Sequence, residues 1–290
     1  MKKCIFFLLA IFTYFVLQAQ EGTESKVLSN TIKSKVLNVD RSYTIFLPKS
    51  YETKSQKKYP ILYLLHGLMD TDTRWYERGH LKDVMDQLVA SGEAKEMLIV
   101  TPNAGGDVFK GYWNGYFDMP GWKYETFFFD EFLPYIEKTY RVVGDKQNRA
   151  IAGLSMGGGG TTVYAQKHTD MFCAAYPMSA LMQREEKHTE IPKELTQWYW
   201  LNEAVKENDC VKFVWNADEQ TLNKLRSVKW FIDCGDDDFL LNYNLNFVKA
   251  MNDKKVPLEF RVRDGGHTWE YWHSALYTCL PFISRVFQSE

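Results

Sequence analysis

A single serine stands among glycines in the stretch RAIAGLSMGGGGTTVYAQKH, which runs from Arg149 to His168. Ser155 occupies the centre of the pattern G-x-S-x-G, and three further glycines follow Gly157. Glycines at this density serve two kinds of chemistry. Their backbone N–H groups bind a phosphate, or they let the chain turn sharply enough to expose a nucleophilic serine. The neighbouring residues distinguish these two kinds of site.

A phosphate site would need residues that this stretch lacks. A P-loop has a lysine followed by serine or threonine after its glycines, and a dinucleotide fingerprint has glycine where this chain has Ser155. The segment RAIAG is apolar enough for a buried strand, and GGTTVYAQKH can form a helix, which is the context of a nucleophile elbow. Gly153 and Gly157 keep side chains away from such a strained turn. We therefore predict that Ser155 is a nucleophile.

A serine hydroxyl becomes reactive when an adjacent base takes its proton and an acid holds that base. Both groups follow Ser155 in the sequence, in the order serine, acid, histidine that proteins with this kind of nucleophile elbow use. His267 lies on a glycine loop in RVRDGGHTWEYW, and the segment before it, WFIDCGDDDFLLNYN, places carboxylates past the end of a strand. Four aspartates crowd that turn: Asp233, Asp236, Asp237 and Asp238. The sequence predicts His267 as the base and one of these carboxylates as the acid.

A tetrahedral intermediate also needs two backbone N–H donors. The residue after the nucleophile, Met156, supplies one of them in this kind of elbow, and a loop after an early strand supplies the other. That loop is LLHGLMDTDTRW, in which Gly67 allows a close approach of the backbone, so Leu68 is the second predicted donor. His66 precedes Ser155 in the chain, and we interpret it as a structural residue that shapes the loop.

Composition and charge exclude several classes of function. The chain of 290 residues is 45% hydrophobic and 25% charged, as is usual for globular proteins. Its net charge of -2 leaves no basic face for phosphates, so nucleic acid is not an expected partner. No group of histidine, aspartate, glutamate or cysteine has the spacing of metal ligands, so we expect neither a metal nor another cofactor. Four cysteines follow the N-terminal segment, and their spacing leaves disulfides an open question: Cys173, Cys210, Cys234 and Cys279.

The N-terminus has the pattern of a secretory signal. Lys2 and Lys3 precede an apolar run from Ile5 to Val16, and a small residue, Ala19, stands before polar residues. We predict a signal peptide over 1–19, which is too short to span a membrane stably. The alternative is an N-terminal anchor that is not removed. Cleavage would leave an exported protein, periplasmic or secreted, without a stable membrane span.

Strand and helix patterns alternate along the rest of the chain. TIKSKVLNVDRSYTIFLP predicts two antiparallel strands joined at Asp40-Arg41, and apolar strands then alternate with helices, including one that contains Pro134. This alternation predicts a single α/β domain over 20–290, with a mostly parallel, doubly wound sheet and helices on both faces. An aromatic segment over about 181–228 interrupts the alternation, and we predict a helical insertion there, near the active site.

The motifs together resemble the esterase D and feruloyl esterase group of α/β hydrolases, which is similar to the antigen 85 mycolyltransferases. The resemblance is carried by LLHGLMDTDTRW, EFLPYIEKTYRV, RAIAGLSMGGGGT, DMFCAAYPMSAL, FIDCGDDDF and GGHTWEYW. It implies an α/β-hydrolase fold with Ser155 as nucleophile, His267 as base and Asp238, at the G-x-x-D position, as acid. Leu68 and Met156 become the oxyanion donors. The family includes exported esterases that remove acetyl or feruloyl groups from plant polysaccharides, and siderophore and thiol-ester hydrolases.

The position of Asp238 also suits the acid on physical grounds. It comes after the turn and before Phe239 and Leu240, which we expect to re-enter the core, so packing would fix it on one side. Asp233 belongs to the strand, and Asp236 and Asp237 lie in the turn, where aspartates commonly bond the backbone. A triad acid must be fixed and partly buried, because it holds one tautomer of the imidazole.

The leading prediction is an exported serine carboxylesterase that cleaves acetyl or feruloyl esters of plant-wall carbohydrate. An acyltransferase that passes the same acyl group to a sugar remains an alternative, as does a siderophore or thiol-ester hydrolase. A binding module with an inactive site would lack a triad member, and none is missing. Four tryptophans are candidate contacts for a flat or sugar-bearing substrate: Trp113, Trp122, Trp198 and Trp200.

Overall fold

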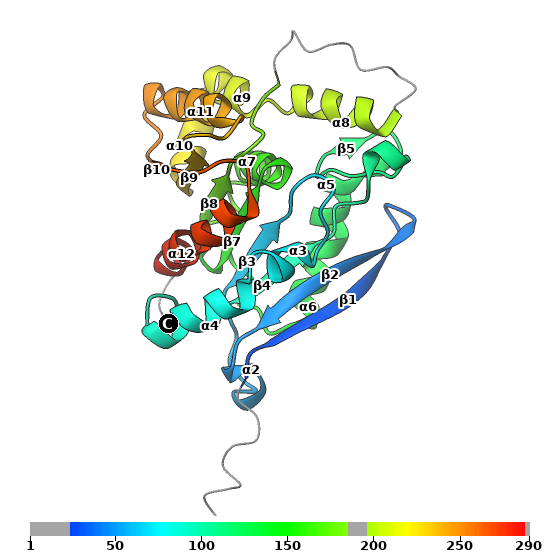
Figure 1. Ribbon diagram of the computed structural model, residues 1–290, viewed down its shortest axis with the longest axis vertical. Coiled ribbons are helices and arrows are strands. Elements are labelled where there is room, and N and C mark those ends of the chain that lie inside the picture. The colour runs from blue at the N-terminus through cyan, green and yellow to red at the C-terminus, as the bar shows by residue number, and fades with distance from the viewer. Residues whose placement is uncertain (1–23, 185–195, 288–290) are drawn as a thin grey trace, which may run out of the picture.

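The computed structural model describes residues 24–184 and 196–287 (Figure 1). The predicted signal peptide lies outside the described residues. The strands of the main sheet are β1 (Lys26–Ser34), β2 (Val39–Leu47), β3 (Ile61–Leu65), β4 (Leu98–Pro102), β7 (Arg149–Leu154), β8 (Ala174–Met178), β9 (Lys229–Gly235) and β10 (Leu258–Arg263). Their order is β1-β2-β4-β3-β7-β8-β9-β10. β2 pairs antiparallel with both β1 and β4, and every later pair in the sheet is parallel. The predicted mostly parallel sheet is confirmed.

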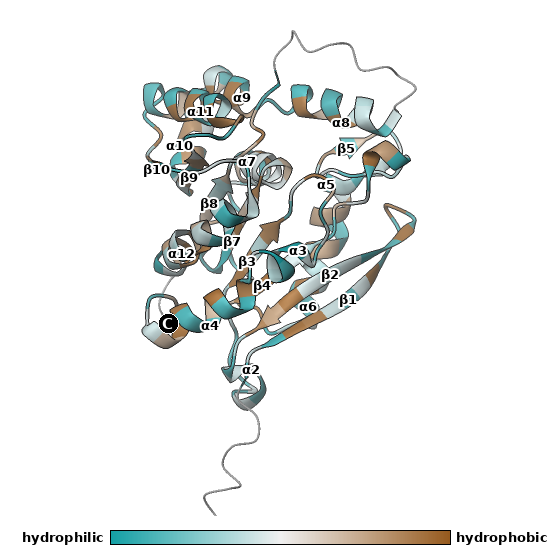
Figure 2. Cartoon of the chain, viewed as in Figure 1, coloured by the Kyte–Doolittle hydropathy of each residue, from teal (hydrophilic) through white to brown (hydrophobic). Residues whose placement is uncertain are grey.

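The central strands are buried on both faces. All five residues of β3 are buried; Ile61, Tyr63 and Leu65 belong to one hydrophobic cluster, while Leu62 and Leu64 belong to another. Successive side chains of a strand point to opposite faces, so a strand covered on both sides is apolar throughout. Figure 2 shows β3 accordingly in brown. β3 is a continuous apolar run because each of its faces packs into a different hydrophobic cluster.

Helices cover the two faces of the sheet. α4 and α12 contribute to one hydrophobic cluster, and α5, η2, α6, α7, α11 and the helices between β8 and β9 contribute to the other. The bounds outside residues 196–226 are α2 (Ser50–Thr53), α3 (Arg74–Glu77), α4 (Leu81–Ser91), η1 (Val108–Lys110), α5 (Tyr124–Phe127), η2 (Phe128–Phe132), α6 (Leu133–Thr139), η3 (Lys146–Asn148), α7 (Met156–Lys167), α11 (Leu241–Asp253) and α12 (Trp269–Val286). A short ribbon, β5 (Asp118–Met119) with β6 (Trp122–Lys123), lies outside the main sheet.

Three helices lie between β8 and β9, where the helical insertion is predicted. They are α8 (Thr196–Glu207), α9 (Cys210–Asn216) and α10 (Glu219–Arg226). Asp209 and Asp218 cap α9 and α10, because each carboxylate accepts backbone N–H groups of the first turn. Residues 185–195, within the predicted insertion, lie outside the described residues. The predicted domain bounds stay predictions.

One local feature contradicts the prediction from the sequence, and a second adds detail to it. The turn between β1 and β2 spans residues 35–38, not Asp40-Arg41, because Asn38 takes the left-handed conformation (φ 53°) that a tight turn needs. Asp40 and Arg41 therefore lie within β2. The helix predicted around Pro134 is present; a π-helical segment, η2, precedes α6, and Pro134 stands in the first turn of α6.

The four cysteines of the described ranges are free and buried. Cys173, Cys210, Cys234 and Cys279 therefore behave as small hydrophobic residues, which answers the open question about disulfides for this structure. Among residues 24–184 and 196–287, no helix combines the length and apolarity needed to cross a membrane.

Candidate active site

Ser155 lies on a strained turn between β7 and α7. Its backbone has φ 54° and ψ -117°, a conformation that residues with side chains rarely adopt. The flanking glycines are required by close packing: a Cβ on Gly153 would lie 2.6 Å from the carbonyl oxygen of Gly157. A Cβ on Gly157 would lie 2.5 Å from the carbonyl oxygen of His66. The structure thus forms the strand–turn–helix elbow predicted from the sequence.

The glycine run continues into the first turns of α7 for the same reason. A Cβ on Gly158 would lie 2.7 Å from Cβ of Ala180, and one on Gly159 would lie 2.4 Å from the carbonyl oxygen of Leu181. Gly157, Gly158, Gly159 and Gly160 are all buried. Glycines at these positions therefore bring α7 against the chain that follows β8.

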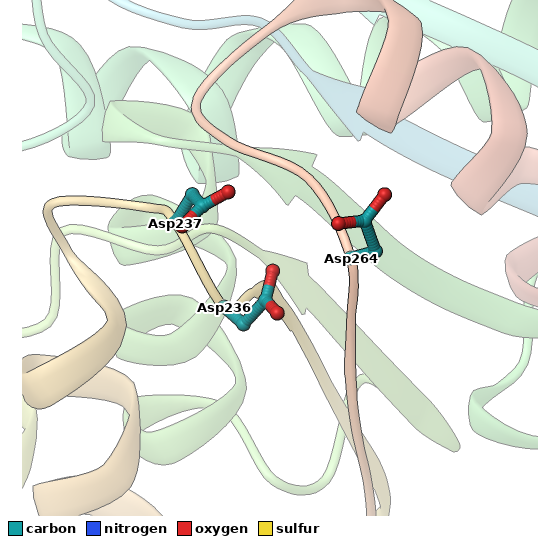
Figure 3. A group of neighbouring side chains, drawn as sticks. All are labelled: Asp236, Asp237 and Asp264. Atoms are coloured by element: carbon teal, nitrogen blue, oxygen red, sulfur yellow. The ribbon is translucent and has the colours of Figure 1, made fainter.

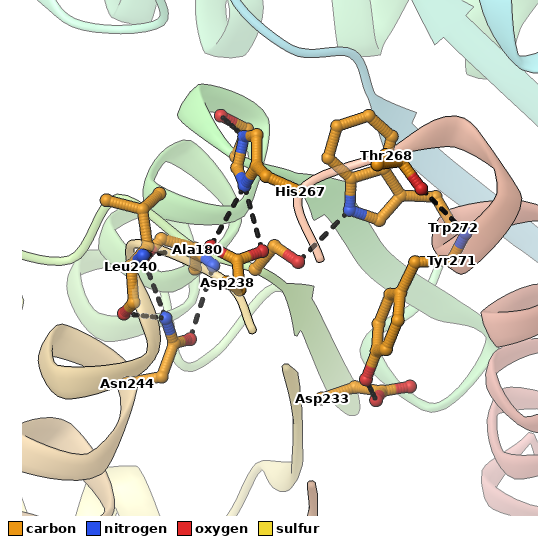
Figure 4. A network of polar contacts seen from close by, with 11 residues as sticks. Ala180, Asp233, Asp238, Leu240, Asn244, His267, Thr268, Tyr271 and Trp272 are labelled. Atoms are coloured by element: carbon orange, nitrogen blue, oxygen red, sulfur yellow. Dashed lines mark hydrogen bonds and ion pairs between the residues drawn. The ribbon is translucent and has the colours of Figure 1, made fainter. Parts of the chain in front are cut away.

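Ser155, His267 and Asp238 form one hydrogen-bonded series across the carboxyl ends of β7, β9 and β10. His267 Nε2 lies 2.9 Å from Ser155 Oγ, and His267 Nδ1 lies 2.9 Å from Asp238 Oδ2 and 3.1 Å from Oδ1 (Figure 4). With Nδ1 donating to the carboxylate, Nε2 is free to accept the serine proton. The structure brings together the three residues that we predicted from the sequence as nucleophile, base and acid.

Asp238 is held by more than His267. Its residue is 5% exposed, and Oδ1 accepts the Leu240 backbone N–H at 2.8 Å. Burial alone would raise the pKa of this carboxyl, but hydrogen bonds from His267, from the Leu240 amide and from the Ser179 hydroxyl outweigh it and lower the pKa. The carboxylate is therefore ionised and fixed, as a triad acid requires.

Ser179 and Trp272 form a support behind this pair. Ser179 follows β8, is fully buried and has a positive φ of 44°. Its hydroxyl accepts the Trp272 indole N–H at 3.1 Å, and the Trp272 ring meets the His267 imidazole edge to face, with centroids 4.9 Å apart. The buried Asn244 links the two sides, because its amide bonds the backbone of both Ala180 and Leu240. No local sequence pattern indicates this support.

The other three aspartates of the turn have different surroundings. Asp233 is fully buried and bonds Tyr176, Tyr271 and Arg261, so its side chain faces neighbouring elements and not the loop. Asp236 is exposed, and its Oδ1 accepts the Gly265 backbone N–H at 3.0 Å. Asp237 is exposed as well. Asp238 is therefore the member of the cluster that reaches His267.

Asp236, Asp237 and Asp264 form an exposed group whose carboxylate oxygens all lie within 4.8 Å of one another (Figure 3). Exposed acidic groups of this kind are common without an ion. All three residues lie in the two loops that also carry Asp238 and His267. The group therefore carries no assignment of a metal.

The two predicted oxyanion donors lie on either side of Ser155. Met156 is the first residue of α7, so its N–H has no acceptor within the helix. Gly67 is next to Ser155, because a Cβ built on it would lie 3.7 Å from Ser155 Cβ, and Leu68 follows directly. In the described part of the chain, no acceptor is found for the N–H of Leu68 or Met156. Both groups remain available for a developing oxyanion.

His66 and Tyr116 fix the loop that carries Leu68. His66 is fully buried; its Nδ1 lies 2.8 Å from the Gly67 carbonyl oxygen, and its Nε2 accepts the Ala104 N–H at 2.9 Å. Burial lowers the pKa of His66 to about 4, so the ring is neutral at pH 7. The Tyr116 hydroxyl accepts the His66 N–H at 2.8 Å and donates to the His66 carbonyl at 3.0 Å. These contacts agree with the structural role predicted for His66.

Phe239 lies outside the core, contrary to the prediction from the sequence. It was expected to re-enter the core with Leu240, but only Leu240 is buried, whereas Phe239 is 74% exposed. The Phe239 ring lies 4.5 Å from the His267 ring, measured between centroids. An apolar ring in this position shields one side of the imidazole from water. The prediction that Phe239 is buried rested on its hydropathy alone.

The four candidate tryptophans lie in different surroundings. Trp113 is partly buried, and Trp122 is 5% exposed with its indole N–H bonded to the Gly115 carbonyl. Trp198 and Trp200 of α8 are partly buried; the Trp198 ring lies 5.2 Å from Phe109. Because Trp122 is buried, little of the surface of its ring is accessible to a ligand. A substrate contact by any of the four stays a prediction.

Comparisons with known proteins identify the family and the fold. A family model described as "Putative esterase" matches residues 34–283. A solved structure of a ferulic acid esterase is 64% identical, with a TM-score of 0.89, and the match covers 92% of this chain and 100% of that one. A ferulic acid esterase from the anaerobic fungus Anaeromyces mucronatus shares the fold at 21% identity, with a TM-score of 0.68 over 93% of this chain and 94% of that one. The predicted α/β-hydrolase fold is confirmed.

One curated relative is much longer than this chain. It is an endo-1,4-beta-xylanase/feruloyl esterase from Xylanibacter ruminicola, 35% identical over 131 residues. The match covers 44% of this chain and 18% of the relative, so the matched part is less than a fifth of that protein.

Proposed function

The chain belongs to this esterase family, and from that premise we propose that it is a serine carboxylesterase that cleaves acetyl or feruloyl esters of plant-wall carbohydrate. The observation that carries the proposal is the series from Ser155 through His267 to Asp238, with both outer contacts at 2.9 Å. The 64% identity to a ferulic acid esterase supports the feruloyl group as the acyl part. The xylanase/feruloyl esterase among the relatives supports carbohydrate as the alcohol part.

In the proposed reaction, Ser155 Oγ attacks the ester carbonyl carbon while His267 Nε2 takes its proton. The N–H groups of Leu68 and Met156 bind the oxyanion of the tetrahedral intermediate. When the intermediate collapses, the alcohol leaves with the proton from His267, and the acyl group remains on Ser155. Water then attacks the acyl-enzyme and gives a proton to His267. The carboxylic acid departs as Ser155 recovers that proton.

The test is a screen of purified protein on methyl ferulate, on p-nitrophenyl acetate and butyrate, and on feruloylated and acetylated xylo-oligosaccharides. The proposal predicts hydrolysis of the feruloyl or acetyl substrates with a preference for the carbohydrate esters. Equal rates on all small esters, with no release from the oligosaccharides, would remove carbohydrate from the proposal. Absence of any hydrolysis would overturn the esterase assignment itself.

Transfer to a sugar and thioester hydrolysis use the same acyl-enzyme. The reaction with a feruloyl donor is therefore repeated with and without a free acceptor sugar, and the products are separated. Hydrolysis predicts free ferulic acid in both reactions, whereas a transferase would form a new sugar ester. A thioester substrate is included in the same assay to test for thioester hydrolysis.

The proposal includes export, and the sequence pattern of residues 1–19 supports it. These residues lie outside the described ranges, so the support comes from the charged and apolar pattern alone. Mass spectrometry of the protein recovered from the periplasm or the medium tests the prediction. Export predicts a mature N-terminus near Gln20, and an uncleaved chain in the cytoplasm would contradict it.

Ser179 gives a prediction about positioning. Ser179→Ala removes the acceptor of the Trp272 indole and one hydrogen bond to the Asp238 carboxylate, so we expect turnover to fall about ten- to a hundredfold. KM should change little, because Ser179 is buried behind the triad. Trp272→Phe, which keeps a ring but loses the indole N–H, should have a smaller effect of the same kind. A change in KM alone would show that Ser179 acts on substrate binding instead.

A second prediction concerns metal. Ester hydrolysis should be unchanged after incubation with excess chelator, since Ser155 is activated by His267 and needs no metal-bound water. The rate is measured before and after chelation and again after adding calcium or zinc. Asp236→Asn with Asp264→Asn serves as the matched control for the acidic group of Figure 3. Loss of activity that calcium or zinc restores would assign a metal to the reaction.

A further inference from the structure

A groove of about 400 Å³ lies between the turn of the β1–β2 hairpin and the loop that follows β4. Its lining combines aromatic residues, glycines and one cation, and it includes no member of the triad. Five of its lining residues are Arg41, Asn103, Tyr112, Trp113 and Gly121. Pockets with aromatic walls and a few fixed polar groups are typical of small-molecule sites.

Arg41 forms no direct ion pair in the described part of the chain, and the Asn103 side chain lies between it and the Asp72 carboxylate. Its Nε and Nη2 donate to the Asn103 carbonyl at 3.3 and 3.1 Å, and its guanidinium lies over the Trp122 ring, 5.3 Å from the centroid. Within residues 24–184 and 196–287, Arg41 forms no ion pair, and Nη1 has no hydrogen-bond partner. Its burial lowers its pKa, although Tyr124 and Asp72 act in the opposite direction. A partly buried arginine held in place by neutral groups is suited to binding an anion.

Aromatic side chains lie beside this cation. Tyr112 is 62% exposed, which is unusual for a large ring unless it meets a partner. Trp113 is partly buried and lies against the chain at Gly121, where an added Cβ would be 3.1 Å from the indole ring. Rings with one exposed face pack against the apolar face of a ligand while polar groups at the edge bind its oxygens. A pyranose ring presents such a face.

The groove and the triad lie at the same edge of the sheet. Asn103 and Ala104 follow β4, which is separated from β7 by β3 alone, so the lateral distance is two strand spacings, about 10 Å. The Ala104 N–H donates to His66 Nε2 at 2.9 Å, which connects the groove loop to the loop carrying Leu68. A single oligosaccharide can therefore reach both places.

We propose that this groove binds a sugar residue carrying a carboxylate, a uronic acid, on the same polysaccharide whose ester the triad cleaves. The polysaccharide as substrate rests on the proposed function. The carboxylate accepts hydrogen bonds from Arg41, with Nη1 as the free donor, and the sugar ring lies against Tyr112 and Trp113. The protein would thus select acidic segments of the polysaccharide for deacylation.

The test uses Ser155→Ala protein, in which binding can be measured without cleavage. Calorimetry compares a xylo-oligosaccharide bearing one glucuronic acid with the same oligosaccharide lacking it. The acidic ligand should bind about ten- to a hundredfold more tightly, the effect of a hydrogen bond between charged groups. Adding Arg41→Gln should remove this preference, and Tyr112→Ala should weaken both ligands about three- to tenfold.

Lys33→Gln is the matched control, because it removes a positive charge from the same hairpin at an exposed position outside the groove. It should change neither affinity. Equal binding of the two ligands, or an acidic preference that survives Arg41→Gln, would overturn the proposal. Arg41→Gln also alters contacts to Asn103, so Tyr112→Ala provides an independent test at an exposed residue; unchanged affinities there would overturn the aromatic contact. Hydrolysis of methyl ferulate by the wild type is measured separately, so failure of the esterase proposal and failure of the groove proposal remain distinguishable.

Discussion

Ser155→Ala is expected to lose about five to six orders of magnitude in turnover and all labelling by a fluorophosphonate probe, the loss typical of removing a triad nucleophile. The reason is that among the hydroxyl groups of the described chain, the one at Ser155 lies 2.9 Å from the candidate base His267. The variant should fold, since alanine can occupy the space of the serine side chain. Its circular dichroism and thermal midpoint are compared with those of the wild type.

Ser91→Ala is the control for this experiment. Ser91 lies at the end of α4, where its hydroxyl bonds the Leu88 carbonyl, and its loss should leave labelling and turnover unchanged. Mass spectrometry of peptides from the labelled wild type identifies the modified residue. Label found on another serine, or label that persists in Ser155→Ala, would refute the assignment of the nucleophile.

Asp238→Asn is expected to fold but to lose about three to four orders of magnitude in turnover, the scale seen when an orienting acid becomes an amide. The asparagine cannot accept from His267 Nδ1 at both of the positions that the carboxylate occupies, at 2.9 and 3.1 Å, and it favours the wrong tautomer. Asp237→Asn is the matched control. Asp237 is exposed one residue away, so its loss should cost about tenfold or less by altering the local field.

The same pair of variants tests the linkage between Asp238 and stability. The native pKa of this carboxyl is lowered, so its ionised form stabilises the folded protein at pH values above the unfolded pKa, and this contribution is lost as the pH falls through the native pKa. The difference in thermal midpoint between wild type and Asp238→Asn should therefore shrink toward acidic pH.

A greater loss of turnover in Asp237→Asn than in Asp238→Asn would transfer the role of acid to Asp237.

The elements around the site could be predicted because their signals are local. The apolar run before Ser155 and the glycines around it specify a strand, a sharp turn and a helix within twenty residues. The chain order of serine, aspartate and histidine then located His267 and the acidic turn. Within that turn, the family position of Asp238 selected one carboxylate of four, and the geometry places this carboxylate against the imidazole.

Features that depend on distant residues could not be predicted in this way. Ser179 and Trp272 are 93 positions apart and meet only after the sheet and α12 have assembled. Phe239 has the hydropathy of a core residue but lies exposed over His267, because the loop turns it outward before Leu240 enters the core. The turn at 35–38 was misplaced because alternation of polar and apolar residues marks strands without marking where they reverse.

The glycines at the start of α7 have a consequence for the order of folding. Glycine is about 1 kcal/mol less favourable than alanine in a helix, so four in succession leave this segment with almost no helical preference of its own. The first turn of α7 becomes stable when Leu65, His66, Ala180, Leu181 and Tyr116 close around it, since these residues fill the space where side chains would be. We therefore expect the turn at Ser155 to order after β3, β7 and β8 have aligned. On warming, we expect the same turn to loosen before the sheet unfolds, so that esterase activity is lost at a lower temperature than sheet structure.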